Sequence, residues 1–351
     1  MSEILIQPDA LVAIVAAIVR ASGSEQREAD LVATNLVEAN LAGHDSHGVG
    51  MLPRYIEVVL EGDLPPNQHP TIELDTGPLL RVNGNAGYGQ VIGMETMELG
   101  IARARQHGVC LVSLINSHHL ARIGQWAEQC IDAGLVSVHF VNVLPRPIVA
   151  PFAGRDGRFS TNPFCVGIPL KGQPPFVLDF ATSRIAAGKV RVAYNKGKAL
   201  EPDTLLDAAG EPTTDPRNLV IEPLGALLPF GGHKGYGMAM ACELMAGAVS
   251  GGQTLHHTGE GTMRRQIINN MLSILIDPRI YGTQDVCAKQ AAAFVDWVKA
   301  SPPRDADGIL IAGDPERRTR AERRANGIPV DENTWEEIRA AGAKVNVTIP
   351  N

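Results

Sequence analysis

Two stripes of apolar residues at helical spacing open the chain. The first comprises Leu11, Ile14, Val15, Ile18 and Val19. It begins just after Pro8, a residue that suits the first turn of a helix. A Ser-Gly-Ser break at 22–24 ends this stripe, and Ser24 is placed to cap a second helix that stops at Gly43. The pattern therefore predicts two helices within residues 8–43.

From about residue 79 the pattern changes to an alternation of strands and helices. Strands are predicted over 79–82, 109–115, 135–143, 164–168, 175–180 and 271–276, and helices over 94–107, 124–133, 238–248 and 288–300. We also expect a short helix and a proline-rich crossing over 51–75, and a charged helical tail over 316–342.

These elements predict an α/β fold class with a mixed sheet and a helical domain built from the N- and C-terminal segments. We place residues 1–75 plus about 250–351 in the mainly helical domain. Residues from about 76 to 250 are expected to form the mixed α/β domain. The sequence shows no internal repeat.

The composition is that of an ordinary globular protein. Of its 351 residues, 44% are hydrophobic and 20% are charged, which is far from the regime of disorder. The formal net charge is −7 without a long basic run, so we expect neither nucleic acid nor a membrane as a partner. The apolar run at 11–19 is shorter than the ~20 residues of a membrane span. Five widely spaced cysteines fit reduced thiols, so we expect a cytoplasmic protein.

A glycine-rich turn at Gly87, Gly89 and Gly93 follows one predicted strand and precedes a helix. It resembles the dinucleotide fingerprint, in which glycines let the backbone approach a pyrophosphate. Its spacing is one residue longer than the commonest form, and the next predicted strand ends near Asn116 without an acidic residue for a ribose hydroxyl. We therefore expect a tight turn with close helix packing, and a non-Rossmann fold.

The first candidate for chemistry is the segment His44-Asp45-Ser46-His47, at the end of the second predicted helix. Hydride transfer to a ketone leaves an alkoxide that must be protonated, and imidazole titrates near neutral pH. A neighbouring hydroxyl or carboxylate can fix the tautomer of that imidazole. The same residues also suit a polar turn whose side chains bond only the backbone.

The second candidate is Asn116-Ser117-His118-His119, which follows a buried strand, with Arg122 three residues further on. Ligands bind at strand ends in α/β proteins. Paired histidines also suit a metal-dependent hydrolase or lyase that would use His44 and His47 as well. Because no HExxH or carboxylate-rich partner accompanies them, we expect no metal.

Four further places carry polar side chains suited to binding. They are Arg54, the pair Thr161 and Asn162, the strand end 178–183 with Asp179, and the glycine-rich segment 230–237 with His233 and Lys234. An arginine can clamp a carboxylate, and glycines at a helix start can cradle an anion. Each also has an ordinary structural interpretation as a capped strand end, a turn or a solvated side chain.

Taken in order, these motifs resemble those of the type-2 malate/L-lactate dehydrogenases, also called sulfolactate dehydrogenase-like oxidoreductases. The matching segments are NLAGHDSHGVGMLPRY, NSHHLARIGQWAEQC, RFSTNPFCVGIP, LDFATS, HKGYGMA and ILIAGDPE. They are spread over roughly residues 8–330, and six motifs in order are far more specific than any one of them.

The resemblance implies an oxidoreductase that interconverts a small 2-hydroxy acid and its 2-oxo acid, or that reduces a cyclic imine carboxylate. It implies NAD or NADP bound outside a Rossmann domain, and a homodimer. His47 and His119 would compete as acid/base, with Ser46 and Asp179 orienting the ring, while Arg54, Thr161 and Asn162 would hold substrate. The implied cofactor contacts are His47, Ala121, Arg122, Ile123, Val177, Leu178, Asp179, Phe180, Ala181, His233, Lys234, Asn269, Ala312, Gly313, Asp314 and Pro315.

Many members of that family carry an arginine where this chain has Met51. We expect the change to weaken recognition of a second, highly charged substrate carboxylate. Two other classes stay open on the sequence: the metal-dependent hydrolase or lyase, which chelators would inhibit, and a small-molecule binder without turnover.

Overall fold

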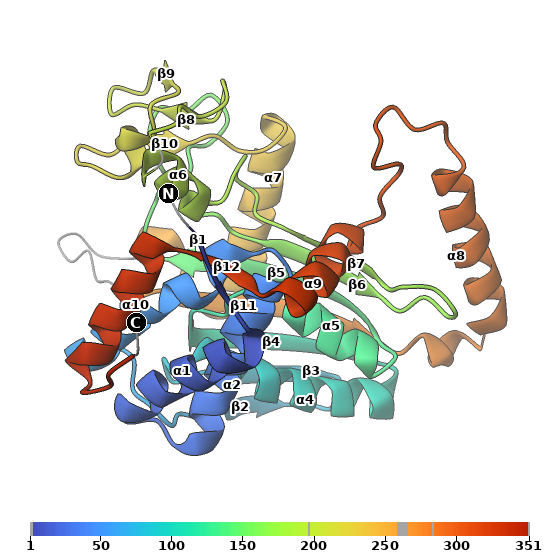
Figure 1. Ribbon diagram of the computed structural model, residues 1–351. Helices are drawn as coiled ribbons and strands as arrows, with labels where there is room; N and C mark the ends of the chain where they lie inside the picture. Colours follow the sequence, from blue (N-terminus) through green and yellow to red (C-terminus); the bar gives the residue numbers. More distant parts are fainter. Residues whose placement is uncertain (1–2, 196, 258–265, 283, 350–351) are drawn as a thin grey trace.

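The centre of the protein is a mixed β-sheet, seen in a computed structural model that describes residues 3–195, 197–257, 266–282 and 284–349 (Figure 1). Its seven described strands lie in the order β2 (Thr71–Asp75), β3 (Leu79–Asn83), β4 (Val109–His118), β11 (Ile268–Ile276), β5 (Val136–Leu144), β6 (Phe164–Ile168) and β7 (Phe176–Phe180). β3 and β4 are parallel, and the other neighbouring pairs are antiparallel. The expected α/β fold with a mixed sheet is confirmed. Its many antiparallel pairs distinguish the sheet from a Rossmann sheet, which is mostly parallel.

Successive side chains along each strand point to opposite faces of the sheet. Helices cover both of these faces. α4 (Gly89–His107) and α5 (Gly124–Asp132) pack on one face, against Val112 and Leu114 of β4. Ser113 lies between them and donates a hydrogen bond to the carbonyl of Ser250 on the other side (2.9 Å). That side is covered by α7 (His233–Cys242) and the π-helix η4 (Glu243–Val249) that continues it.

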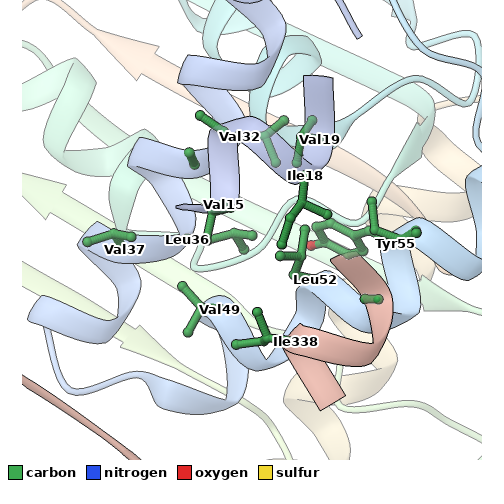
Figure 2. Packing of buried hydrophobic residues seen from close by; sticks show 14 of the residues in the cluster. Val15, Ile18, Val19, Val32, Leu36, Val37, Val49, Leu52, Tyr55 and Ile338 are labelled. Atoms are coloured by element: carbon green, nitrogen blue, oxygen red, sulfur yellow. The ribbon is translucent and has the colours of Figure 1, made fainter. Parts of the chain in front are cut away.

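A second core joins the two ends of the chain. Its helices are α1 (Pro8–Ala21), α2 (Gln26–Leu41), α3 (Leu52–Glu61) and α10 (Glu332–Lys344). Figure 2 shows their apolar side chains meeting, with Tyr55 among them. β1 (Glu3–Ile6) pairs antiparallel with β12 (Ile328–Asp331), and α9 (Asp314–Asn326) packs on α2. The expected helical domain from both chain ends is therefore confirmed.

Two smaller parts complete the described structure. A three-stranded sheet, β10 (Ala226–Leu227), β8 (Leu205–Leu206) and β9 (Pro212–Thr213), lies near α6 (Ala187–Asn195). α8 (Gln284–Lys299) stands apart at the right of Figure 1, and none of residues 285–299 is buried. Within the described ranges, no helix combines the length and apolar character that a membrane span requires.

Several expectations from the sequence need correction. β11 lies at the centre of the sheet and β2 at its edge, although we assigned both segments to the helical domain. β11 packs between two strands, so its neighbours in space and not in sequence decide its place. The tail over 316–342 that we expected to be helical contains the strand β12. β12 has only four residues, too few to show the alternation of apolar and polar positions that predicts a strand. Ser24 does not cap α2: its hydroxyl donates to Glu28 (2.6 Å).

The glycine-rich turn packs α4 against the end of β4, as its structural interpretation required. α4 begins at Gly89, five residues before the helix we predicted. A Cβ at Gly89 would lie 2.1 Å from the carbonyl oxygen of His119, and one at Gly93 would lie 2.6 Å from the ring of Trp126. The carbonyl of Gly87 also accepts a hydrogen bond from the amide of His118 (3.0 Å).

We expect Gly89→Ala to lower the free energy of unfolding by at least about 2 kcal/mol, because the added methyl group meets a buried backbone carbonyl that cannot move aside. Gly237→Ala in α7 is the matched control, since a Cβ there meets no atom within 4 Å and alanine favours a helix by up to about 1 kcal/mol. Urea unfolding of both variants measures the difference. A Gly89→Ala protein as stable as the parent would contradict this close approach.

Candidate active site

Three strands that run in the same direction bring candidate residues to one edge of the sheet. The pairing of the strands makes β4, β5 and β7 point the same way. β4 ends at His118, β5 ends at Leu144, and β7 ends just after Asp179. Ligands in α/β proteins bind outside the carboxyl ends of strands. The candidate site is therefore expected at this edge.

The two histidines that compete for the acid/base role lie face to face. The rings of His47 and His119 stack with their centroids 5.7 Å apart and an interplanar angle of 20°. His47 ends the short 3-10 helix η1 (Asp45–His47), and His119 follows β4. The structure thus joins the first and second candidate segments of the sequence.

Tyr55 fixes the orientation of His119. The Tyr55 hydroxyl lies 2.6 Å from Nδ1 of His119 and accepts a hydrogen bond from Nε2 of Gln90 (3.1 Å). Burial raises the pKa of Tyr55 and lowers the pKa of His119 well below its usual value. Tyr55 therefore keeps its proton and donates it to Nδ1, which leaves Nε2 to carry the hydrogen of the neutral imidazole.

The sequence did not single out Tyr55 or Gln90. An aromatic residue within an apolar stripe is expected in a core, and Tyr55 does belong to the helical core (Figure 2). The hydroxyl is the one polar group of the Tyr55 side chain. The position of Tyr55 in the sequence does not indicate that its hydroxyl contacts His119.

His47 contacts the neighbouring Ser46. The Ser46 hydroxyl lies 3.0 Å from Nδ1 of His47, so the expected hydroxyl neighbour of the imidazole is present. The pKa of His47 is lowered to about 4, chiefly by burial and further by the positive charges of His44 and Arg122. The start of α6 packs directly on Ser46, because a Cβ at Gly188 would lie 2.7 Å from Cβ of Ser46.

The other two residues of this turn, His44 and Asp45, tie the segment to α9. Nε2 of His44 lies 3.3 Å from Glu316. The Asp45 carboxylate accepts hydrogen bonds from Arg323 at 2.6 and 3.0 Å. α9 begins in the segment 312–315 that we expected to contact a cofactor.

Two of the expected cofactor segments are in direct contact. The amide of Val177 donates to the carbonyl of Ala312 (3.1 Å). Beside them, Asp179 accepts a hydrogen bond from the amide of Gly124 at the start of α5 (2.7 Å). Burial raises the pKa of Asp179, and Arg122 opposes the shift. In the described structure the Asp179 carboxylate holds α5, and the orienting contact to His47 comes from Ser46.

The turn between His119 and α5 contains a residue with a strained backbone and a buried arginine. Ala121 has a φ of +56°, a left-handed conformation that costs a residue with a Cβ about 1–3 kcal/mol and that clusters at functional sites. Arg122 is 2% exposed and forms an ion pair with Glu128. Nε of Arg122 is buried without a hydrogen-bond partner among the described residues. Ile123, also expected at the cofactor, is buried in the sheet core.

Asn162 and Asn269 lie behind the site. Asn162 is fully buried and donates to Glu243 (2.7 Å). Asn269 accepts from the amide of Leu120 (2.8 Å) and donates to the carbonyl of Asn142 (2.9 Å). We expected Asn162 to bind substrate and Asn269 to contact the cofactor. In this structure their amide groups hold the backbone around the site, and their contacts with substrate and cofactor stay predictions.

Of the remaining expected residues, Arg54 lies on α3, while backbone hydrogen bonds link the segment with Thr161 to the segment that precedes His233 and Lys234. The carbonyl of Thr161 accepts from the amide of Thr182 (2.9 Å), and the carbonyl of Thr182 accepts from the amide of Phe230 (3.1 Å). Residues 161, 182 and 230 are thereby connected. His233 and Lys234 come next, exposed at the start of α7.

The histidines do not form a metal-binding set. His118 is 1% exposed, and burial lowers its pKa to about 3. Neither of its ring nitrogens has a described hydrogen-bond partner. In the described part of the chain, no group of three or more His, Cys, Asp or Glu side chains is arranged to hold a metal ion. The donor geometry that a metal-dependent hydrolase or lyase needs is not found there.

The candidate site thus combines a mixed, non-Rossmann sheet with two stacked imidazoles at the sheet edge. The sequence profile of the family described as malate/L-lactate dehydrogenase matches residues 6–339. The chain belongs to this family. It is therefore a dehydrogenase of the malate/lactate type, which interconverts 2-hydroxy acids and 2-oxo acids.

Individual relatives agree with this assignment. The chain is 49% identical over 331 residues to hydroxycarboxylate dehydrogenase B of Escherichia coli (strain K12), covering 94% of this chain and 91% of that protein. A solved structure of an E. coli protein assigned to the malate/lactate dehydrogenases superposes with a TM-score of 0.95 and 47% identity, over 99% and 96% of the two chains. The Δ1-piperideine-2-carboxylate reductase of Pseudomonas syringae superposes with a TM-score of 0.85 and 29% identity, over 96% and 99%.

We expect Tyr55→Phe to release His119 from its single tautomer and to lower the free energy of unfolding by about 1–3 kcal/mol, because Gln90 and His119 each lose a buried partner. Nitrogen NMR of the imidazoles reads the tautomer directly. Leu60→Ala, at an exposed position on the same helix, is the control and leaves the His119 signals unchanged. A His119 that shows the same Nε2–H tautomer in Tyr55→Phe would contradict the assignment.

Proposed function

We propose that the protein is an NAD(P)-dependent oxidoreductase that interconverts a small 2-hydroxycarboxylate and its 2-oxocarboxylate. The observation that carries the proposal is the stacked pair of His47 and His119, of which His47 is half-buried and His119 buried, with the pKa of both rings lowered. Two neutral imidazoles at a strand edge suit the exchange of one proton with the oxygen on C2 of such an acid.

The residues around the pair fit a nicotinamide dinucleotide. Residues 121–123, 177–181 and 312–315 adjoin one another through the contacts of Gly124 with Asp179 and of Val177 with Ala312. The unpartnered Nε of Arg122 is a buried donor for an acceptor on the cofactor, and Lys234 at the start of α7 suits a phosphate. When bound, the nicotinamide supplies or accepts the hydride.

We assign different roles to the two histidines. His119 carries its hydrogen on Nε2, because Tyr55 occupies Nδ1, so it donates a hydrogen bond to the C2 oxygen and polarises the bond. His47 is neutral at physiological pH, so it accepts the hydroxyl proton during oxidation and returns it during reduction. Ser46 holds the His47 ring through Nδ1. Arg54 and Thr161 are the groups proposed to hold the substrate.

A screen of 2-oxo acids with NADH and with NADPH tests the reaction, followed by the absorbance of the reduced nicotinamide. We expect turnover with at least one pair and loss of at least 100-fold in kcat for His47→Gln, with cofactor binding kept. The absence of turnover with every 2-oxo acid and cyclic imine would refute the proposal.

A second candidate reaction is the reduction of a cyclic imine carboxylate by NAD(P)H. Its support is the similarity to the Δ1-piperideine-2-carboxylate reductase. The C=N bond of such a substrate also needs one hydride and one proton at adjacent atoms, so the same residues serve both reactions. The ratio of kcat/KM for the cyclic imine and for the 2-oxo acids decides between them.

The low pKa of His47 predicts opposite pH profiles for the two directions. The protonated form falls about tenfold per pH unit above a pKa of about 4. We therefore expect kcat/KM for reduction to fall steadily as pH rises from about 5 to 8, while kcat/KM for oxidation stays level because the base is already neutral. His47→Gln should lose the slope in the reductive direction. A reductive profile that levels off below an apparent pKa near 6.5 would contradict the lowered pKa of His47.

We also propose that the protein forms a homodimer through α8. Val286, Phe294 and Trp297 of this helix are 62%, 63% and 72% exposed, and exposed apolar patches mark contact surfaces. Residues 300–311 connect α8 to the segment 312–315 that is proposed to contact the cofactor. A second copy of the chain bound to α8 would therefore also restrict the motion of that segment.

Light scattering after size-exclusion chromatography tests this surface. We expect a dimer for the parent protein and a shift to monomer for Phe294→Ser/Trp297→Ser, because two aromatic side chains leave the interface. Leu60→Ser, which removes an exposed leucine on α3, is the control and stays dimeric. A parent protein that is monomeric, or a double variant that remains a dimer, would refute the role of α8.

A further inference from the structure

A cavity of about 500 Å³ lies between α3 and α10. Its lining does not include His47, His119 or Asp179. The lining residues are Gly50, Pro53, Arg54 and Glu57, then Glu337, Ala340, Ala341 and Lys344, with Arg146 and Arg191 at the sides. Each group of four has the spacing i, i+3, i+4, i+7, so each helix presents one face to the cavity. Ala340 and Ala341 contribute only methyl groups to this lining.

The cavity is positively charged in an acidic protein. Four cationic side chains line it, against the two carboxylates of Glu57 and Glu337, while the whole chain has a net charge of −7. Both carboxylates already form ion pairs across the cavity wall: Lys344 to Glu57 at 2.8 Å and Arg191 to Glu337 at 3.0 Å. Counted over these lining residues alone, cationic side chains exceed carboxylates by two, and such an excess concentrates anions locally.

The size and the donors of the cavity identify the class of ligand. A volume of about 300–1,000 Å³ is typical of small-molecule sites. Guanidinium groups match the two oxygens of a carboxylate or a phosphate. We propose that this cavity binds a small oxyanion group, a carboxylate or a phosphate, with Arg54, Arg146 and Arg191 as its donors.

The cavity communicates with the histidine pair through α3. Arg54 lines the cavity, and the next residue, Tyr55, bonds His119. The charge of Arg54 contributes to the low pKa values of His118 and His119. An anion on Arg54 offsets that charge, and so favours the protonated state of the neighbouring imidazoles that reduction uses.

Two sources of the oxyanion are compatible with this chemistry. One is a second carboxylate at the far end of a substrate whose C2 lies at His47 and His119; this source rests on the proposed function. The other is a free anion such as phosphate, which binds whether or not that function is correct.

Isothermal titration calorimetry of the full chain with inorganic phosphate at constant ionic strength tests the site without turnover. We expect one phosphate per chain and at least tenfold weaker binding in Arg146→Gln/Arg191→Gln. Arg155→Gln is the matched control, because Arg155 is 75% exposed and pairs with Glu211 elsewhere on the surface. Circular dichroism confirms that the variants are folded.

Kinetics with a 2-oxo acid that carries a distal carboxylate, and with one of equal length that lacks it, separate the two sources. A selective loss of at least tenfold in kcat/KM for the dicarboxylate in the double variant supports the substrate as the source. Weaker phosphate binding with unchanged kinetics supports a free anion. The proposal is overturned if the double variant binds phosphate as the parent does, or if the parent binds none and the two substrates respond equally. An enzyme that turns over neither substrate would refute the proposed function and leave the calorimetric result valid.

Discussion

The close approach of α4 to the end of β4 is the constraint on which the rest of the site depends. At Gly89 the first turn of the helix lies against the carbonyls of His118 and His119, with no room for a side chain. The amide of His118 is bonded to Gly87 in the same contact. The strand therefore extends to His118, and the chain must turn sharply after it through the left-handed Ala121. This turn brings both His119 and Arg122 to the sheet edge.

From this edge the site joins the two cores of the protein. Tyr55 belongs to the helical core, but its hydroxyl bonds the histidine that the sheet presents. Asp45 is bonded to Arg323 of α9, so the segment with His47 depends on the C-terminal part of the chain as well. Each contact contributes only about 1–3 kcal/mol. Together they make the positions of the two imidazoles depend on the packing of the whole fold and not on one loop.

Helices and strands with a regular period of apolar residues could be predicted from the sequence, and so could polar segments that directly follow such an element. The strand at 164–168 and the helices of residues 8–43 are recognisable because their periods are regular, and the segments with His47 and His119 because polar residues come directly after an apolar element. The pairing of β1 with β12, which are four residues each, and the central place of β11 could not be predicted in this way. Nor could the support that Tyr55 and Asn269 give to the site, since their partners lie 64 and 149 residues away in sequence. Long-range contacts of this kind leave no periodic trace.

The electrostatics of the site arise from burial more than from any charged partner. Removal from water is the largest cause of the low pKa values of His47, His118 and His119. Three neutral rings can pack closely, but a charge on His47 lowers the pKa of His119 further. Each ring therefore favours its neutral form, and a nearby negative charge would oppose this preference. In the proposed reaction the carboxylate of a 2-oxo acid would supply such a charge, so substrate binding would favour protonation of His47.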